Sequence, residues 1–176
     1  MIFLTIVTSL TIAAATDAPL TVTQDLIRRE VIALDGIWEG AGNRVRLVAF
    51  LGPKFTNGHF EMLEHLQTIE QFYCSEVPAK PECLKALSAT KGLRYVEIVG
   101  CGQLIDGLPL VGQDNLKEIE LLRANDCKVS TTVFETIQIM TKLKTLELSD
   151  VEFKPADIRL LEQLKSLKQL VVISTI

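Results

Sequence analysis

One spacing of apolar residues recurs in the segments Leu93-Arg-Tyr-Val-Glu-Ile98, Leu116-Lys-Glu-Ile-Glu-Leu121 and Leu143-Lys-Thr-Leu-Glu-Leu148. Each segment begins with an apolar residue and carries two more, three and five positions later. The same triplet begins at Val45, Ile69 and Leu167, so that successive starts lie 24, 24, 23, 27 and 24 residues apart. A period of this length is typical of a solenoid in which each coil supplies one strand and one return segment.

Further apolar residues follow each strand at fixed distances and support the repeat. In the first coil they are Phe60, Leu63 and Leu66, which lie 15, 18 and 21 residues after Val45. Apolar residues three apart form the inner stripe of a helix or helical turn. The fourth coil matches once a three-residue insertion near residues 124–126 is removed. Each coil is therefore predicted to be a strand, a turn and a helical return, with an irregular 3₁₀ return around Pro109 in the third coil.

These segments resemble the leucine-rich repeat proteins, and residues 52–66 are similar to the bacterial variant of that repeat. The resemblance covers Ile37 to the end of the chain. It implies an α/β fold, a right-handed leucine-rich repeat solenoid with a parallel concave sheet and helical or 3₁₀ convex segments. It says little about function, because one fold supports many functions.

The first 15 residues are predicted to be a signal peptide. Residues 2–15 are apolar and end in three alanines, which suit a cleavage site, although no basic residue precedes the apolar core. An uncleaved anchor and a buried N-terminal strand are the alternatives. The stretch is shorter than the roughly 20 apolar residues that span a bilayer, so no membrane span is expected. The predicted location is outside the cell, in the periplasm or in the cell envelope.

Residues 16–43 are predicted to form an N-terminal cap of one helix followed by a strand and a turn. Thr21 and Gln24 resemble a capping box. The inner face of the helix is predicted to consist of Leu26, Ile27, Val31 and Leu34. Such a cap would cover the open end of the first coil. Trp38, the only tryptophan, is expected to pack there, with ligand stacking as the alternative.

Residues 44–176 are predicted to hold five full coils and a final strand that begins at Leu167. No return helix is expected after this strand, so its backbone edge and apolar face would be open. Self-association through this edge is one interpretation. A chain that is a fragment, or a short tail over the core, is the other.

The concave face of the sheet is the predicted functional surface. Alternate residues of a strand face opposite sides, and this count gives the predicted partner-binding residues Tyr73, Tyr95, Glu97, Glu118, Glu120 and Glu147. The same count puts no basic residue among these glutamates and makes the two tyrosines stacking neighbours. We therefore predict a non-catalytic protein-binding module whose unknown partner is basic or extended. The alternatives are glutamates that only aid solubility, and an assembly element that associates through the C-terminal edge.

Charge and spacing argue against several other functions. A net charge of −4 with scattered signs disfavours nucleic acid as the main partner. His59 and His65 are six residues apart, which is not a metal-ligand spacing on a helix. Gly100 and Gly102 follow a strand like the start of a dinucleotide fingerprint, but Ile105 replaces the third glycine. No enzyme activity, cofactor or metal is expected.

The four cysteines allow one disulfide hypothesis. Cys101 is at a turn position, and Cys127 shares that position one coil further on if the insertion in the fourth coil precedes it. A bond between Cys101 and Cys127 is one interpretation, because neighbouring strands bring Cα atoms within bonding range; stacked reduced thiols are the other. Cys74 is expected to be a buried apolar residue, out of register with Cys101.

Overall fold

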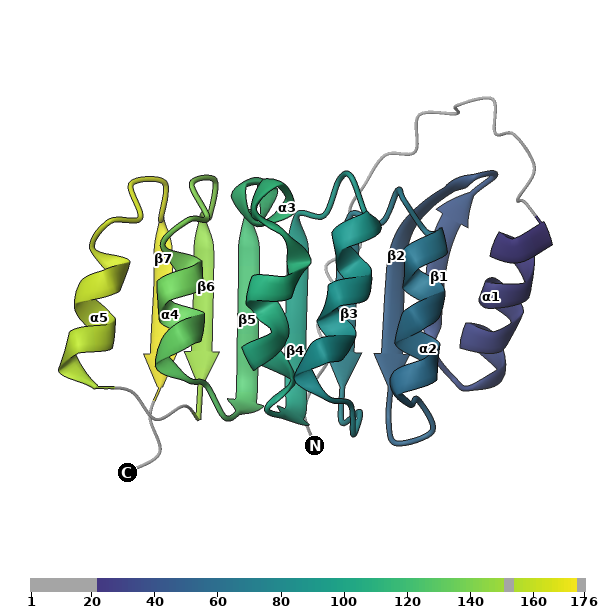
Figure 1. The fold of residues 1–176 in the computed structure, drawn as a ribbon, viewed down its shortest axis with the longest axis horizontal. Coiled ribbons are helices and arrows are strands. Elements are labelled where there is room, and N and C mark those ends of the chain that lie inside the picture. The colour runs from purple at the N-terminus through teal and green to yellow at the C-terminus, as the bar shows by residue number, and fades with distance from the viewer. Residues whose placement is uncertain (1–21, 151–153, 174–176) are drawn as a thin grey trace.

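The computed structural model describes residues 22–150 and 154–173, which form a seven-stranded sheet with helical segments in front of it (Figure 1). The strands follow one another across the sheet in chain order: β1 (Ile37–Ala41), β2 (Arg44–Leu51), β3 (Gln71–Ser75), β4 (Tyr95–Gly102), β5 (Leu121–Cys127), β6 (Thr145–Ser149) and β7 (Gln169–Ile173). β2 to β7 are parallel, and β1 is antiparallel to β2.

A helical segment returns the chain from the end of each parallel strand to the start of the next. These segments, preceded by the N-terminal helix α1 (Val22–Ala33), are α2 (Asn57–Glu61), η1 (Met62–His65), η2 (Pro81–Ala89), η3 (Leu104–Val111), α3 (Gln113–Glu118), α4 (Thr131–Ile137) and α5 (Pro155–Leu161). The η segments are 3₁₀ helices, so the predicted 3₁₀ return around Pro109 is confirmed by η3. The coarse prediction of an α/β fold with a mostly parallel sheet is also confirmed.

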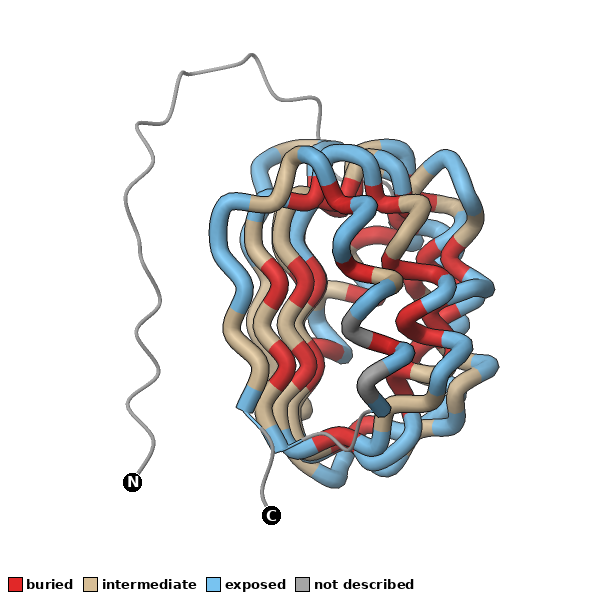
Figure 2. Tube along the Cα trace, turned by 90° about the vertical axis from the view of Figure 1, so that its left-hand side faces the viewer, coloured by how far each residue is buried: buried red, intermediate tan, exposed pale blue. Residues whose placement is uncertain are grey.

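The core lies between the sheet and the helical layer. Every second residue of a strand points toward the helices, and these residues form rows across the sheet. One row is completely or almost completely buried from β2 to β6: Val48, Phe72, Val96, Leu122 and Leu146. Figure 2 shows these buried positions facing the buried positions of the helical layer. The other strand residues face away from the core and form the exposed face of the sheet.

The predicted register of the fourth parallel strand is wrong by three residues. Leu122 and Ala124 align with Val96 and Ile98, whereas Leu121 aligns with Tyr95 on the exposed face. The triplet that matches the other coils therefore begins at Ile119 rather than Leu116. Leu116 is buried within α3 instead. Both triplets satisfy the apolar spacing, so the spacing alone could not choose between them.

The turn after each strand confirms the corrected register. The residue seven positions after the first apolar residue of each coil has a positive φ angle: Gly52, Glu76, Gly100, Asp126 and Asp150. This left-handed conformation favours glycine and, among other residues, Asp and Asn. The seventh residue after Leu116 is Arg123, whereas the seventh residue after Ile119 is Asp126. The insertion therefore lies before β5, not at residues 124–126.

The extra residues lengthen the return segment between β4 and β5, which consists of η3 followed by α3. η3 packs closely on η2 because Gly107 has no side chain. A Cβ atom at position 107 would lie 1.8 Å from the carbonyl oxygen of Pro81, which is a severe clash. Gly107 thus allows two neighbouring helical returns to stack at backbone contact.

α1 covers the side of the core next to β1 and β2. Ile27 and Val31 are buried, and Leu34 packs against the core, as predicted. Leu26 is 61% exposed, so its prediction as a core residue is wrong, because it lies on the solvent side of the helix. Trp38 packs against the core from β1, which agrees with the structural interpretation of this residue. The predicted signal peptide over residues 1–15 lies outside the described residues.

Candidate functional site

The exposed face of the sheet carries a row of charged side chains at its centre. Glu97 of β4, Arg123 of β5 and Glu147 of β6 are directly opposite one another in register. Arg123 Nη1 donates a hydrogen bond to Glu97 Oε2 at 3.2 Å, and Arg123 Nε donates to Glu147 Oε2 at 3.0 Å. The prediction that no basic residue interrupts the glutamates is therefore wrong, and the cause is the three-residue error in register.

Electrostatics within this row favour the charged form of Arg123. Partial burial lowers its pKa, but the two flanking carboxylates outweigh this effect and leave the pKa raised. A guanidinium between two carboxylates fixes all three side chains by charge-assisted hydrogen bonds. The row has one more negative than positive charge. It is therefore an ordered surface with a small excess of acid, rather than the strongly acidic face expected from the sequence.

Glu118 and Glu120 do not lie in the exposed row, so their predicted positions on that face are wrong. Glu118 is the last residue of α3, and Lys142 Nζ donates to its Oε2 at 2.6 Å. Glu120 precedes β5 and accepts a 2.6 Å hydrogen bond from Lys144 Nζ. This hydrogen bond is the main cause of the lowered pKa of Glu120. Both glutamates belong to the edge of the sheet where the parallel strands begin.

Tyr73 and Tyr95 both lie on the exposed face, as predicted. Tyr73 is opposite Glu97, and Tyr95 is opposite Gln71 and Leu121, so the two tyrosines are diagonal neighbours. The aromatic ring contacts among the described residues involve other side chains, so the predicted stacking of Tyr73 on Tyr95 is wrong. Burial raises the pKa of Tyr73. Tyr95 is 37% exposed and is the more accessible of the two.

The contacts between the cysteines differ from those that the sequence predicts. All four are free thiols, and the Sγ atoms of Cys74 and Cys101 lie 3.5 Å apart. This contact raises the pKa of Cys74 and lowers that of Cys101. Cys101 reaches Cys74 because the residues on either side of it, Gly100 and Gly102, both have positive φ angles. The two thiols are therefore in contact although their repeat positions differ by three residues, and no disulfide joins them.

Cys127 aligns with Gly102, next to Cys101, and its thiol lies near the carbonyl oxygens of Ile98 and Asn125. Burial raises the pKa of Cys127 to about 11. Cys101 and Cys127 are free thiols in the structure, as in the alternative interpretation, and no disulfide joins them.

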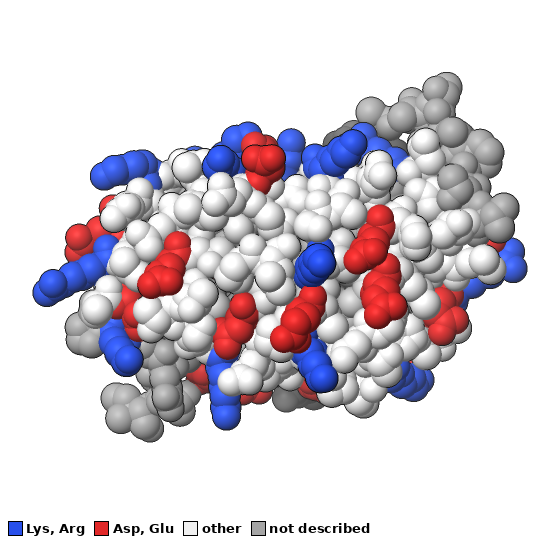
Figure 3. Space-filling model, in the orientation of Figure 1, with Lys and Arg blue, Asp and Glu red and all other residues white. Residues whose placement is uncertain are grey.

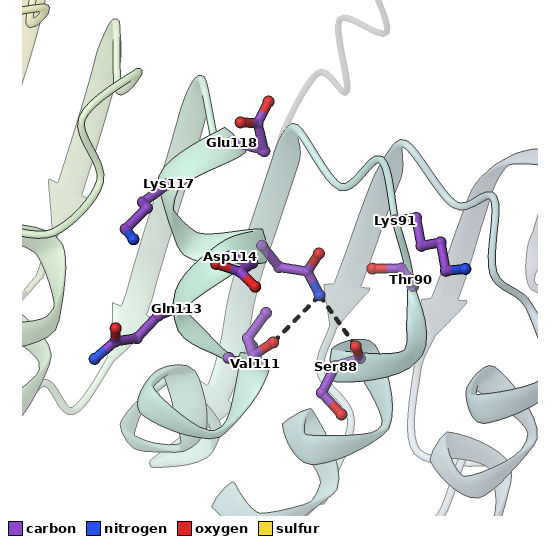
Figure 4. Close-up of a pocket in the computed structure, with 10 residues that line it drawn as sticks. Ser88, Thr90, Lys91, Val111, Gln113, Asp114, Lys117 and Glu118 are labelled. Carbon is purple, nitrogen blue, oxygen red and sulfur yellow. Dashed lines mark hydrogen bonds between the residues drawn. The ribbon is translucent and has the colours of Figure 1, made fainter.

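An open hollow of about 530 Å³, which the sequence did not predict, lies where the lengthened return segment meets η2 (Figure 4). Asn115 of α3 lines it, with Nδ2 within 3.2 to 3.3 Å of the carbonyl oxygens of Leu87, Ser88 and Val111. The rim carries both lysines and acids. The hydrogen bonds of Asn115 give it a structural role, since they tie the inserted helix to the preceding return segment.

The remaining motifs have local structural roles. The Nδ1 atom of His59 accepts a hydrogen bond from the backbone N–H of Thr56 at 2.8 Å, at the start of α2. Gly100 and Gly102 are followed by the 3₁₀ helix η3 rather than by the α-helix of a dinucleotide site. No group of three potential metal ligands occurs within residues 22–150 and 154–173. In the same part of the chain, every helix is too short or too polar to cross a bilayer.

Comparison of the chain with protein-family models, with curated proteins and with solved structures gave no match in any of the three.

Proposed function

We propose that this chain is a leucine-rich repeat protein that binds another protein through the exposed face of its sheet, without a catalytic step. Support for the repeat class comes from the 24-residue spacing of buried residues and from the left-handed residue at one position of each turn. The apolar, cleavable character of residues 1–15 supports an exported protein.

The observation that carries the binding proposal is the ordered exposed face itself. Six parallel strands present their outward side chains on one surface, and the Glu97–Arg123–Glu147 row is held in place by its own hydrogen bonds. Tyr95 lies diagonally beside this row and is exposed. Tyrosine and arginine are enriched at binding hot spots, and tyrosine buries a large area with few rotatable bonds.

The charge of the row defines the partner. Two carboxylates against one guanidinium leave one negative charge, which favours a partner segment with a lysine or arginine at its centre. The neighbouring outward residues Leu121 and Val99 are apolar and half-buried. The proposed partner is therefore an extended protein segment that combines one basic side chain with apolar neighbours.

Site-specific photocrosslinking tests the proposal. A photoreactive phenylalanine analogue replaces Tyr95 in one variant and Leu110 in the other. Leu110 is the matched control, because it is 42% exposed but lies in the helical layer. Both variants are exposed to the protein's native extract. We expect one protein adduct at position 95, absent at position 110 and suppressed by excess unlabelled protein but not by its Glu97→Arg variant. Equal adducts at both positions would contradict the proposal.

A second function, assembly through the outer edge of β7, is favoured by one observation. Leu170 occupies the same row as the buried Leu146, yet it is 46% exposed. β7 pairs with β6 on one side, and no described strand pairs with it on the other. An edge with unpaired backbone groups and an apolar row is suited to accept another strand.

A further inference from the structure

A row of alternating charges marks the edge of the sheet where the parallel strands begin. We call it the charged row: Arg46, Glu70, Arg94, Glu120, Lys144 and Lys168. The backbone N–H of each member after the first donates to the carbonyl oxygen of the member before it, at 2.8 to 2.9 Å. Figure 3 shows lysine and arginine side chains gathered along this edge, at the top of the view.

Each acid of the charged row lies between two bases. Glu70 pairs with Arg46 at 3.8 Å and also with Arg44. Glu120 pairs with Arg94 at 3.7 Å and with Lys144 at 2.6 Å. Ion pairs therefore connect the start of β3 with β2, and the start of β5 with the starts of β4 and β6. Such pairs across a sheet favour one register over its alternatives.

The two acids also share a sequence pattern. Glu70 is followed by the inward-facing Phe72 and Cys74, and Glu120 by the inward-facing Leu122 and Ala124. A strand of this chain that lies beside a strand beginning with a basic residue thus has an acid at its own start and apolar residues two and four positions later.

The alternation stops at Lys168, which follows another lysine, Lys144. Lys165 and Lys168 make no ion pair within the described part of the chain, whereas Lys144 is already paired with Glu120. A hollow of about 360 Å³ lies here and is lined by Glu120, Lys142, Lys144, Lys165, Ser166, Leu167 and Lys168. Lys142 and Lys144 are paired with Glu118 and Glu120, so Lys165 and Lys168 give the hollow its excess of positive charge, in a chain whose net charge is −4.

The basic hollow lies at the start of the strand whose outer edge is open. Beyond Lys168, the inward positions of β7 are Leu170, which is exposed, and Val172, which is half-buried. The next strand in this arrangement would need an acid beside Lys168 and apolar residues beside Leu170 and Val172. β3 meets the same requirement beside β2, and β5 meets it beside β4.

We propose that the outer edge of β7 binds an extended acidic segment of a partner protein as an added parallel strand. An Asp or Glu of that segment pairs with Lys168 in the basic hollow, and apolar residues two and four positions later cover Leu170 and Val172. Main-chain hydrogen bonds to the edge provide affinity in this binding mode, and alternate side chains provide specificity. The proposal rests on the second proposed function and is independent of binding at the exposed face of the sheet.

Fluorescence anisotropy with the full chain and a labelled peptide of residues 118–126 tests this inference. This peptide carries the pattern through Glu120, Leu122 and Ala124. We expect it to bind at least tenfold more tightly than the same peptide with Glu120→Lys. The protein variant Lys168→Glu should reverse this preference. Lys85→Glu, an exposed lysine of η2, is the matched control and should leave the preference unchanged.

The possible outcomes separate the inference from the function on which it rests. If neither peptide binds, strand addition at β7 is contradicted, and the second proposed function with it. If both peptides bind equally, the edge accepts a strand but the acidic partner is contradicted. If the preference persists in Lys168→Glu, the acid does not pair with Lys168 and the inference is overturned.

Discussion

The first and the last strand-and-helix units of the sheet bury their cores to very different degrees. In the first unit Phe50, Phe55 and Phe60 are at most 1% exposed, and the centroid of the Phe50 ring lies 4.5 to 5.8 Å from those of Phe55, Phe60 and the neighbouring Phe72 of β3. In the last unit, Leu170 of β7 is 46% exposed although it occupies a core position. The two units share their architecture but differ in their neighbours, since α1 and β3 flank the first.

The difference shows that a unit of this sheet buries its core mainly against adjacent units. Stability in such an array is a sum of terms within units and terms between neighbours. The apolar spacing in the sequence defines the unit but does not say whether a neighbour is present. A residue at a core position of an end strand is therefore covered by its own unit on one side and leaves an apolar surface open to a partner on the other.

The largest effect should come from the closed first unit. Phe50→Ala removes a buried ring that contacts three other rings, and it leaves a cavity that its neighbours cannot fill. We expect the free energy of unfolding to fall by about 3 to 5 kcal/mol, measured by urea denaturation. A decrease in the free energy of unfolding below about 1 kcal/mol would contradict the tight packing of these rings.

The adjacent inward row, which runs from Val48 to Leu170, gives a matched pair at the other end of the sheet. Leu146→Ala should destabilise the protein by about 2 to 5 kcal/mol, because Leu146 is completely buried between neighbouring strands. Leu170→Ala should cost less than about 1 kcal/mol, because this side chain already faces water on one side. Equal losses in the two variants would contradict the open edge at β7.

A smaller effect is expected on the exposed face at the centre of the sheet. Arg123→Met leaves Glu97 and Glu147 without their shared partner, and we expect a loss of about 1 kcal/mol. The control is Lys54→Met, which removes the exposed ion pair with Asp35 and should change stability by less than about 0.5 kcal/mol. Similar losses in both variants would mean that the row is no more ordered than an ordinary surface pair.

The smallest effect concerns proton binding in the charged row. A lowered carboxyl pKa stabilises the fold above the unfolded-state pKa, and this contribution is lost as the pH falls through the folded-state value. Lys144→Gln should raise the pKa of Glu120 toward its ordinary value and weaken this acid dependence, as followed by NMR titration. Lys168→Gln should leave the pKa of Glu120 unchanged, because Lys168 does not pair with it. A shift with Lys168→Gln would contradict the difference between the centre and the end of the row.

Most of the strands could be predicted because their inward residues repeat at fixed distances. Val48, Phe72, Val96 and Leu146 all lie where the spacing predicts them. β5 was the exception, since Leu116, Ile119, Leu121 and Leu122 offer two overlapping triplets. A signal that distinguishes them was in the sequence: seven positions after Ile119 stands Asp126, which suits the left-handed turn, whereas seven positions after Leu116 stands Arg123, which does not.

The candidate site depended on this register, so one error changed its chemistry. A slip of three residues turns a strand over, because an odd shift exchanges its two faces. The error placed Glu120 on the exposed face, where the structure has Arg123. The contact between Cys74 and Cys101 could not be predicted from repeat position, because it follows from two glycine turns that point Cys101 inward. The exposure of Leu170 follows from the lack of a strand on the outer side of β7 among the described residues, which no residue of β7 encodes.

The central claim is that core burial passes from strand to strand across the sheet and stops at β7. Residue-resolved hydrogen exchange by NMR tests it most directly, because amide protection reports the free energy of local opening. We predict that the inter-strand amides of β3 to β6 exchange with free energies close to that of global unfolding, while those of β7 exchange at least tenfold faster. Equal protection in β6 and β7 would contradict the claim.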